Sequence, residues 1–177
     1  MKQLIFATVF LFAGFSFAET VTEDISSLRK WKAVKVSDHT LMGEDACMAS
    51  TVKSGHRLEV YSAKKGEKFA EPTIHAILND LSEDVYRGKI RFNSGETFTM
   101  TYASREGMPE GVQSLMVRFE DREEIVRLIR AKNTARVDSY NSEGQRVNRT
   151  TFSLSGSSRT VRSQFENCDL KFENLEL

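Results

Sequence analysis

The sequence predicts a mainly β fold, namely an antiparallel β-sandwich or barrel-like domain with two short helices near its C-terminal end. Short apolar or alternating runs, separated by turn residues at regular intervals, fill most of the chain, which is typical of antiparallel all-β folds. Helical spacing of apolar residues occurs in two segments, and both follow residue 120. The 177 residues are 40% hydrophobic and 28% charged, as in ordinary globular domains. With no repeat or linker in the chain, residues 19–177 are expected to form a single domain.

The expected strands begin at Trp31, where apolar and polar residues alternate up to Val36, the pattern of a half-buried strand. Residues 53–55 (Lys-Ser-Gly) and 93–95 (Asn-Ser-Gly) are hairpin-like turns. Residues 19–30 form a polar lead-in. The expected strands are 31–36, 47–52, 58–63, 73–78, 86–92, 97–102, 115–119, 135–140, 147–154 and a final edge strand at 170–172.

The first helix is expected from Asp121 onward. Asp121 is the predicted N-cap, Glu124 can reach back toward it, and Asn133 is a plausible left-handed stop. An apolar stripe at helical spacing follows the cap: Ile125, Val126, Leu128 and Ile129.

The second helix is expected from a serine cap at residues 157–158 to Asn167. Val161, Phe165 and Cys168 follow at i, i+4 and i+7, so this spacing directs the cysteine toward the core.

The first 18 residues have the layout of a secretory signal peptide. Lys2 supplies a positive start, residues 4–15 are apolar, and Ser16 and Ala18 are the small residues of a cleavage site. The apolar run is shorter than the roughly 20 residues of a membrane-spanning helix. We therefore expect cleavage after Ala18 and a periplasmic or secreted protein that does not span the membrane.

The two cysteines, Cys47 and Cys168, are predicted to form a disulfide, because an even pair in an exported domain is most simply a structural bridge. A reactive thiol needs a neighbouring group that lowers its pKa, such as a histidine, and no sequence feature places one beside either cysteine.

No motif predicts a cofactor, a metal site or a catalytic centre. His39, His56 and His75 are scattered along the chain without metal-ligand spacing. Ser155 and Ser157 flank Gly156, but the sequence lacks a nucleophile elbow, and a helix cap explains them better. Phosphate-binding glycine loops are absent. The formal net charge of zero gives no case for nucleic-acid binding, which favours a basic domain.

Charge is nevertheless uneven along the chain. Residues 118–162 carry ten basic and six acidic side chains. A basic face of this kind can dock another envelope protein or an anionic envelope component such as lipopolysaccharide or phospholipid headgroups. Arg130, Lys132 and Arg136 are the predicted contact residues. The alternative is a solvated face with ordinary pairs, such as Glu123 with Arg127 at i, i+4.

A family resemblance lies in the C-terminal third. A helix at 123–132 leads to a strand around Arg136-Val137, a turn at Gly144, and residues 151–158 (Thr-Phe-Ser-Leu-Ser-Gly-Ser-Ser) running into a second helix. This order is similar to the invasion-associated locus B family of exported bacterial proteins, and Trp31 near the start of the domain is compatible with it. The resemblance implies an exported β-sandwich linked to envelope or host-contact biology, without an established catalytic centre.

Three functional hypotheses follow. The leading one is a non-catalytic binding or accessory module of the bacterial envelope. The second is an inhibitor of a secreted hydrolase, which would insert the loop at residues 106–112. The third is an enzyme whose residues assemble only on folding, for example His39 or His75 with a carboxylate and a serine.

Overall fold

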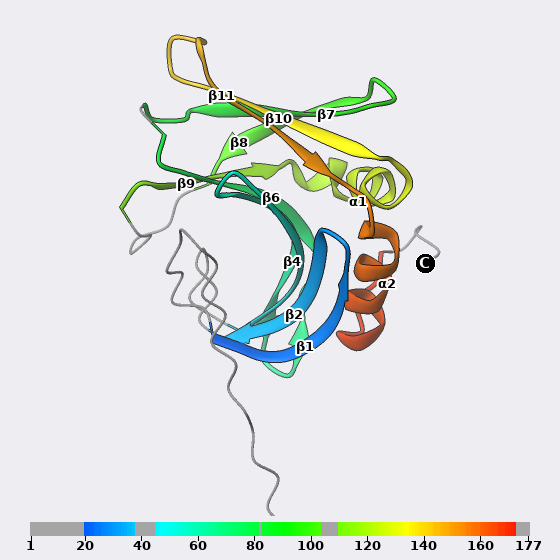
Figure 1. Cartoon of the computed structure of the whole chain (residues 1–177). Coiled ribbons are helices and arrows are strands. Elements are labelled where there is room, and N and C mark those ends of the chain that lie inside the picture. Colours follow the sequence, from blue (N-terminus) through cyan, green and yellow to red (C-terminus); the bar gives the residue numbers. More distant parts are fainter. Residues whose placement is uncertain (1–19, 38–44, 82, 104–109, 173–177) are drawn as a thin grey trace, which may run out of the picture.

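The computed structural model describes residues 20–37, 45–81, 83–103 and 110–172, and it confirms the mainly β fold (Figure 1). Its strands form one antiparallel sheet in the order β1-β2-β3-β4-β6-β9-β8-β7-β10-β11, with β5 paired to β4. The end strands β1 and β11 do not pair with each other, so this sheet is not closed into a barrel. The expected signal peptide lies outside the described residues.

The strands observed are β1 (Thr20–Leu28), β2 (Trp31–Ser37), β3 (Ala46–Lys53), β4 (His56–Lys65), β5 (Lys68–Phe69), β6 (Thr73–Asn79), β7 (Arg87–Phe92), β8 (Thr97–Tyr102), β9 (Val112–Val117), β10 (Thr134–Tyr140) and β11 (Arg146–Ser153). Nine of the expected strands are thereby confirmed. The expected edge strand at 170–172 is wrong, because these residues have no strand structure. Strand β1, within the polar lead-in, was not expected.

Both helices pack on one face of the sheet, to the right in Figure 1. Helix α1 (Arg122–Ala131) follows a short 3-10 turn, Phe119–Asp121, and helix α2 (Ser157–Asn167) follows β11. Their apolar sides and every second residue of the strands form one large core, as the alternation of side chains along a strand dictates. Among the described residues, no helix is long and apolar enough to span a membrane.

The helix ends correct three details of the sequence analysis, of which the third is that Gly156, and not a serine at 157–158, is the N-cap of the second helix. Asp121 is at the N-cap of α1, but its carboxylate bonds to Arg118 and not to the helix backbone. Asn133 is not left-handed, and the helix instead ends at an extended Lys132. Helix α2 is capped by left-handed Gly156, while the Ser157 hydroxyl lies within hydrogen-bond distance of the Ile129 and Leu154 carbonyl oxygens.

The two ends of the sheet meet at one corner. Trp31 is fully buried, and its Nε1 donates to the carbonyl oxygen of Ser153, at 2.9 Å. Gly156 lies against the Leu28 carbonyl, where a Cβ atom would come within 2.3 Å of that oxygen. Its φ of +97° also favours glycine. The junction between β11 and α2 therefore closes on the β1–β2 turn.

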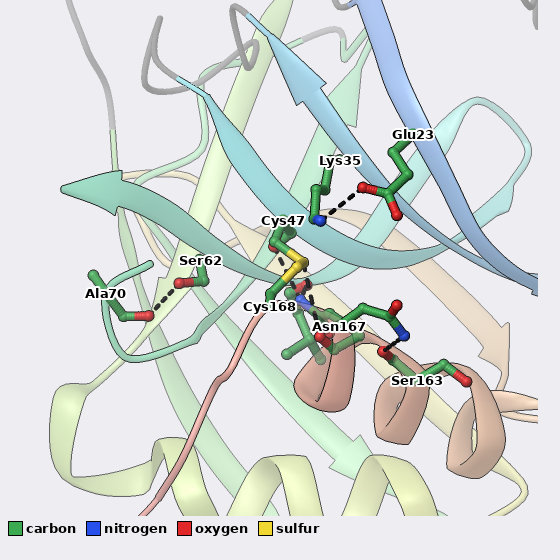
Figure 2. Close-up of a disulfide and its surroundings, with 10 residues drawn as sticks. Glu23, Lys35, Cys47, Ser62, Ala70, Ser163, Asn167 and Cys168 are labelled. Atoms are coloured by element: carbon green, nitrogen blue, oxygen red, sulfur yellow. Dashed lines mark hydrogen bonds and ion pairs between the residues drawn. A yellow bond between two sulfur atoms is a disulfide. The ribbon is translucent and has the colours of Figure 1, made fainter. Parts of the chain in front are cut away.

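The predicted cysteine pair is confirmed. The Sγ atoms of Cys47 on β3 and Cys168 after α2 lie at disulfide distance, 1.99 Å (Figure 2). Beside them, the Gln164 amide is completely buried and donates to the carbonyl oxygens of Cys47 and Val60, at 3.0 and 2.9 Å. The end of α2 is thus joined to the sheet by one covalent bond and two buried hydrogen bonds.

Candidate functional site

The three predicted contact residues do not form one surface. Arg130 lies on α1, where burial and, secondarily, the charge of Arg162 lower its pKa. Lys132 ends that helix, with its Nζ 3.8 Å from the Glu96 carboxylate. Arg136 lies on β10 between the core residues Ala135 and Val137, so its side chain is on the sheet face away from the helices. The sheet separates Arg136 from Arg130.

Arg136 belongs instead to a second group of cations, brought together by strand pairing. On β7, Arg87, Lys89 and Arg91 alternate with buried residues and are exposed. Register places Arg136 opposite Arg91, and Arg149 of β11 opposite Asp138 of β10. We call these five side chains the arginine face: Arg87, Lys89, Arg91, Arg136 and Arg149.

The arginine face carries a strong excess of positive charge. Asp138 is the one carboxylate at the described positions of β7, β8, β10 and β11 that share this face. The five cations of the arginine face and Asp138 sum to a net charge of +4, in a chain whose formal charge is zero. The exposed Arg146, opposite Tyr140 in the β10–β11 register, adds one more cation at the edge of this face. The neighbouring positions on β8 are hydroxyl side chains that are also exposed: Thr97, Thr99 and Thr101.

Two of the arginines donate hydrogen bonds from their Nε atoms, and the Nε atom of a third, Arg136, makes an ion-pair contact without a hydrogen bond. Arg149 Nε donates to Asp138 Oδ1 at 2.5 Å, and Arg136 Nε lies 3.2 Å from Asp138 Oδ2. Arg91 Nε donates to the Thr97 hydroxyl at 3.1 Å. No other described residue bonds to the terminal Nη atoms of these arginines. The guanidinium groups of Arg91 and Arg149 are therefore oriented at their Nε atoms, with their pairs of Nη donors available to a ligand.

Asp138 orients two of these arginines from within the sheet. It is 5% exposed, whereas Arg149 is an exposed side chain. The hydrogen bond from Arg149 to this carboxylate raises the pKa of the guanidinium, so Arg149 stays charged at every physiological pH.

Like charges face each other across the strands. Arg91 and Arg136 are directly opposite in the β7–β10 register, an arrangement that destabilises an antiparallel pair. Threonine flanks both of them in the same row, as Thr97 on β8 and Thr151 on β11. An uncharged residue therefore fits this row, and the stability of the sheet does not account for the presence of two arginines.

A contrasting polar cluster lies on the same sheet face, over β4, β6 and β9 in the middle of the sheet. Arg57 and Glu59 of β4 form a buried ion pair, with Nε 2.8 Å from Oε2. Glu59 is opposite His75 of β6 in register, and His75 Nδ1 lies 3.3 Å from the Ser114 hydroxyl. The structure thus brings His75 close to a serine and a carboxylate, as the enzyme hypothesis required.

This cluster is closed to a substrate in the described structure. Glu59 and Ser114 are both 0% exposed, and His75 is 3% exposed. The Tyr61 ring packs edge-on against the His75 ring, with 4.8 Å between the ring centroids. A serine nucleophile must reach the carbonyl carbon that it attacks, and Ser114 does not reach solvent. His39 lies outside the described residues.

The other sequence candidates have structural partners or are only partly described. Ser155 Oγ accepts from Arg29 Nη1, and Ser157 is held within the α2 cap. Among the described residues, no three or more His, Cys, Asp or Glu side chains gather to hold a metal ion. Of the loop expected for an inhibitor, residues 106–109 lie outside the described residues, and Gly111 makes the turn into β9 with a φ of +76°.

Sequence reasoning found Arg136 but missed its neighbours. Arg87, Lys89 and Arg91 lie in the segment before residue 118, whose net charge is negative. Summing the charge over this segment therefore does not reveal these three cations. The available signal was the alternation Arg-Gly-Lys-Ile-Arg-Phe at residues 87–92, which puts three cations on one face of a strand.

No protein-family model and no curated protein matches this sequence. The resemblance to the invasion-associated locus B family stays a prediction.

Proposed function

We propose that the protein is a non-catalytic binding module of the bacterial envelope, and that its arginine face holds an anionic component of that envelope. The observation that carries this proposal is the excess of five cations over one carboxylate on an exposed sheet face. The opposed Arg91 and Arg136 add weight, because their repulsion is relieved when an anion lies between them.

Export to the periplasm or medium, after cleavage behind Ala18, belongs to the same proposal. The N-terminal pattern of residues 1–18 supports it. The cysteine pair at disulfide distance is compatible with an oxidising compartment. Membership of the invasion-associated locus B-like group would agree with this location.

The experiment is co-sedimentation of the protein with isolated bacterial envelopes. The variant Arg91→Gln/Arg136→Gln neutralises two cations of the arginine face. Its matched control, Arg159→Gln/Arg162→Gln, makes the same change on the exposed side of α2, across the sheet. Both variants have the same net charge, so a difference between them reports position and not total charge.

The wild-type protein and the α2 control should sediment with envelopes, and the arginine-face variant should lose most of this binding. Raising salt from about 0.1 to about 1 M should also release the wild-type protein, because the Debye length falls from about 10 to about 3 Å. Equal binding by the two variants would contradict the proposal.

A further inference from the structure

We infer that the anionic component is the phosphate-bearing surface of a lipid bilayer, on which the arginine face lies flat. This inference rests on the function proposed above and names the chemistry of its partner. It follows from the shape of the charge array, the orientation of the guanidinium groups and the residues that the face lacks.

The cations form an array in two dimensions. Along β7, three of them repeat at every second residue, at spacings of about 6.8 Å. Across the strands, Arg91 and Arg136 are neighbours, as are Lys89 and Asp138, at about 4.8 Å between strands. Arg149 extends the array to β11. A lipid leaflet offers headgroups in two dimensions, whereas a linear polyanion occupies a single row.

The arginines present the donor geometry that phosphate requires. Arg91 and Arg149 are held by hydrogen bonds from Nε to Thr97 and Asp138, and Arg136 Nε lies 3.2 Å from the Asp138 carboxylate as an ion pair. Their paired Nη atoms can then donate two parallel hydrogen bonds to one phosphate group. Anchoring at Nε also reduces the conformational entropy that each side chain loses on binding.

Nucleic acid fits this face less well, because single-stranded binding sites stack bases on aromatic side chains. At the described positions of the face, the aromatic residue is Tyr140, with the Arg87 guanidinium 6.0 Å from its ring centre. A stacking base would compete with that guanidinium for the ring. The remaining neighbours are threonines, which donate hydrogen bonds to headgroups and do not stack.

Large exposed hydrophobic side chains are absent from the described part of this face. The exposed Tyr86 directly precedes β7 and alternates with Arg87, so it is on the opposite side of the strand from the cations. Tyr102 ends β8 on the face that carries Met100 and the core, Phe119 lies in the 3-10 turn before α1, and Val52 lies on β3. Docking therefore relies on charge and hydrogen bonds, without an apolar side chain inserted among the lipid tails. Binding of this kind is reversible and salt-sensitive.

The test uses vesicles of phosphatidylcholine with and without phosphatidylglycerol, and compares wild-type protein with the two matched double variants. We expect binding to the phosphatidylglycerol vesicles only. Arg91→Gln/Arg136→Gln should weaken it by about thirtyfold, the loss expected for two cations at an anionic membrane surface. Arg159→Gln/Arg162→Gln should bind like the wild type, and circular dichroism checks that both variants are folded.

Three results would overturn the inference, and they differ in what they leave standing. Envelope binding that depends on Arg91 and Arg136, without vesicle binding, removes the lipid and leaves the proposed function intact. Vesicle binding that is lost equally in both variants removes the arginine face from both proposals. Tighter binding to single-stranded DNA than to vesicles, at equal phosphate and salt, replaces the lipid by a nucleic acid.

Discussion

The sheet face turned away from the helices has two halves that treat charge in opposite ways. Over β2, β3 and β4 it is buried, lined by a small apolar cluster that includes Val34, Met48 and Tyr61. Its buried cation, Arg57, is matched by Glu59. Over β7, β10 and β11 it is exposed, and the five cations of the arginine face there share one carboxylate. Burial requires a charged group to be paired within the chain. The exposed half has an excess of positive charge that an anionic ligand can neutralise.

The largest effect should come from removing the bond that joins β3, a strand beneath the buried half, to the end of α2. The bridge between Cys47 and Cys168 closes a loop with a sequence separation of 121. We expect Cys47→Ala/Cys168→Ala to lower the free energy of unfolding by up to about 5 kcal/mol, measured by urea denaturation. Envelope binding by the fraction that stays folded should be unchanged, because the arginine face lies on other strands. Lost binding in folded protein would show that the two halves are coupled.

The second effect tests charge matching in the buried half directly. Glu59→Gln removes the negative charge of the carboxylate that lies 2.8 Å from the buried Arg57 Nε. Breaking a buried ion pair from one side costs about 3–5 kcal/mol, and we expect a loss near the lower end because glutamine still offers an oxygen acceptor. Thermal unfolding measures it. A change within about 0.5 kcal/mol, as is usual for surface substitutions, would mean that this half tolerates unmatched charge too.

The third effect is small and has the opposite sign. Arg91→Thr completes a row of threonines around Arg136 and removes a like-charge pair. We expect the free energy of unfolding to rise by about 0.2–0.5 kcal/mol, while envelope binding declines. Stability that falls by more than about 1 kcal/mol would assign Arg91 a structural role and weaken the comparison.

The smallest effect concerns pH and the start of strand β4, which lies apart from the arginine face. His56 begins β4, and its Nδ1 accepts a hydrogen bond from the Asn79 backbone N–H at 3.2 Å. Burial lowers the pKa of His56 below its ordinary value, and the charge of Asp80 opposes this shift only partly. The unfolded chain then binds more protons than the folded chain as pH falls below about 6.5.

The contribution of neutral His56 to the free energy of unfolding should therefore be complete above the pKa of His56 in the unfolded chain. It should be lost as pH falls toward the lower pKa of His56 in the folded chain. Urea denaturation at a series of pH values should show a steeper loss of stability in the wild type than in His56→Gln. Identical profiles would exclude His56 as the source. The five cations of the arginine face stay charged throughout this range, so envelope binding should not follow the titration of His56.

The strands and helices were predictable where one face of the element is buried. Alternation identified β7 and β8, and the apolar stripe identified α1, because in these elements the sequence period matches the structural period. Strand β1 was not predicted, because it is a polar edge strand with register shifts between Val21 and Glu23 and between Asp24 and Ser26. Each shift interrupts the two-residue period on which the prediction depends.

The candidate site was predictable only in part. Arg136 was named from the local density of charge, but Arg91 is 45 residues earlier in the chain and becomes its neighbour through the β7–β10 register. Register between strands distant in sequence depends on the packing of the whole sheet. The cysteine pairing needed no such knowledge, because two cysteines in one domain allow a single bridge.

The corner at Trp31 and Gly156 also has a consequence for the order of folding. Trp31 bonds to Ser153, Arg29 to Ser155 and Cys47 to Cys168, contacts that each span more than 120 residues. Contacts so distant in sequence slow folding, because a long loop must close before they form. While the chain is being synthesised, the N-terminal hairpin has no partner at this corner until the last quarter of the sequence emerges. A chain built in this way stays open longest when it is incomplete.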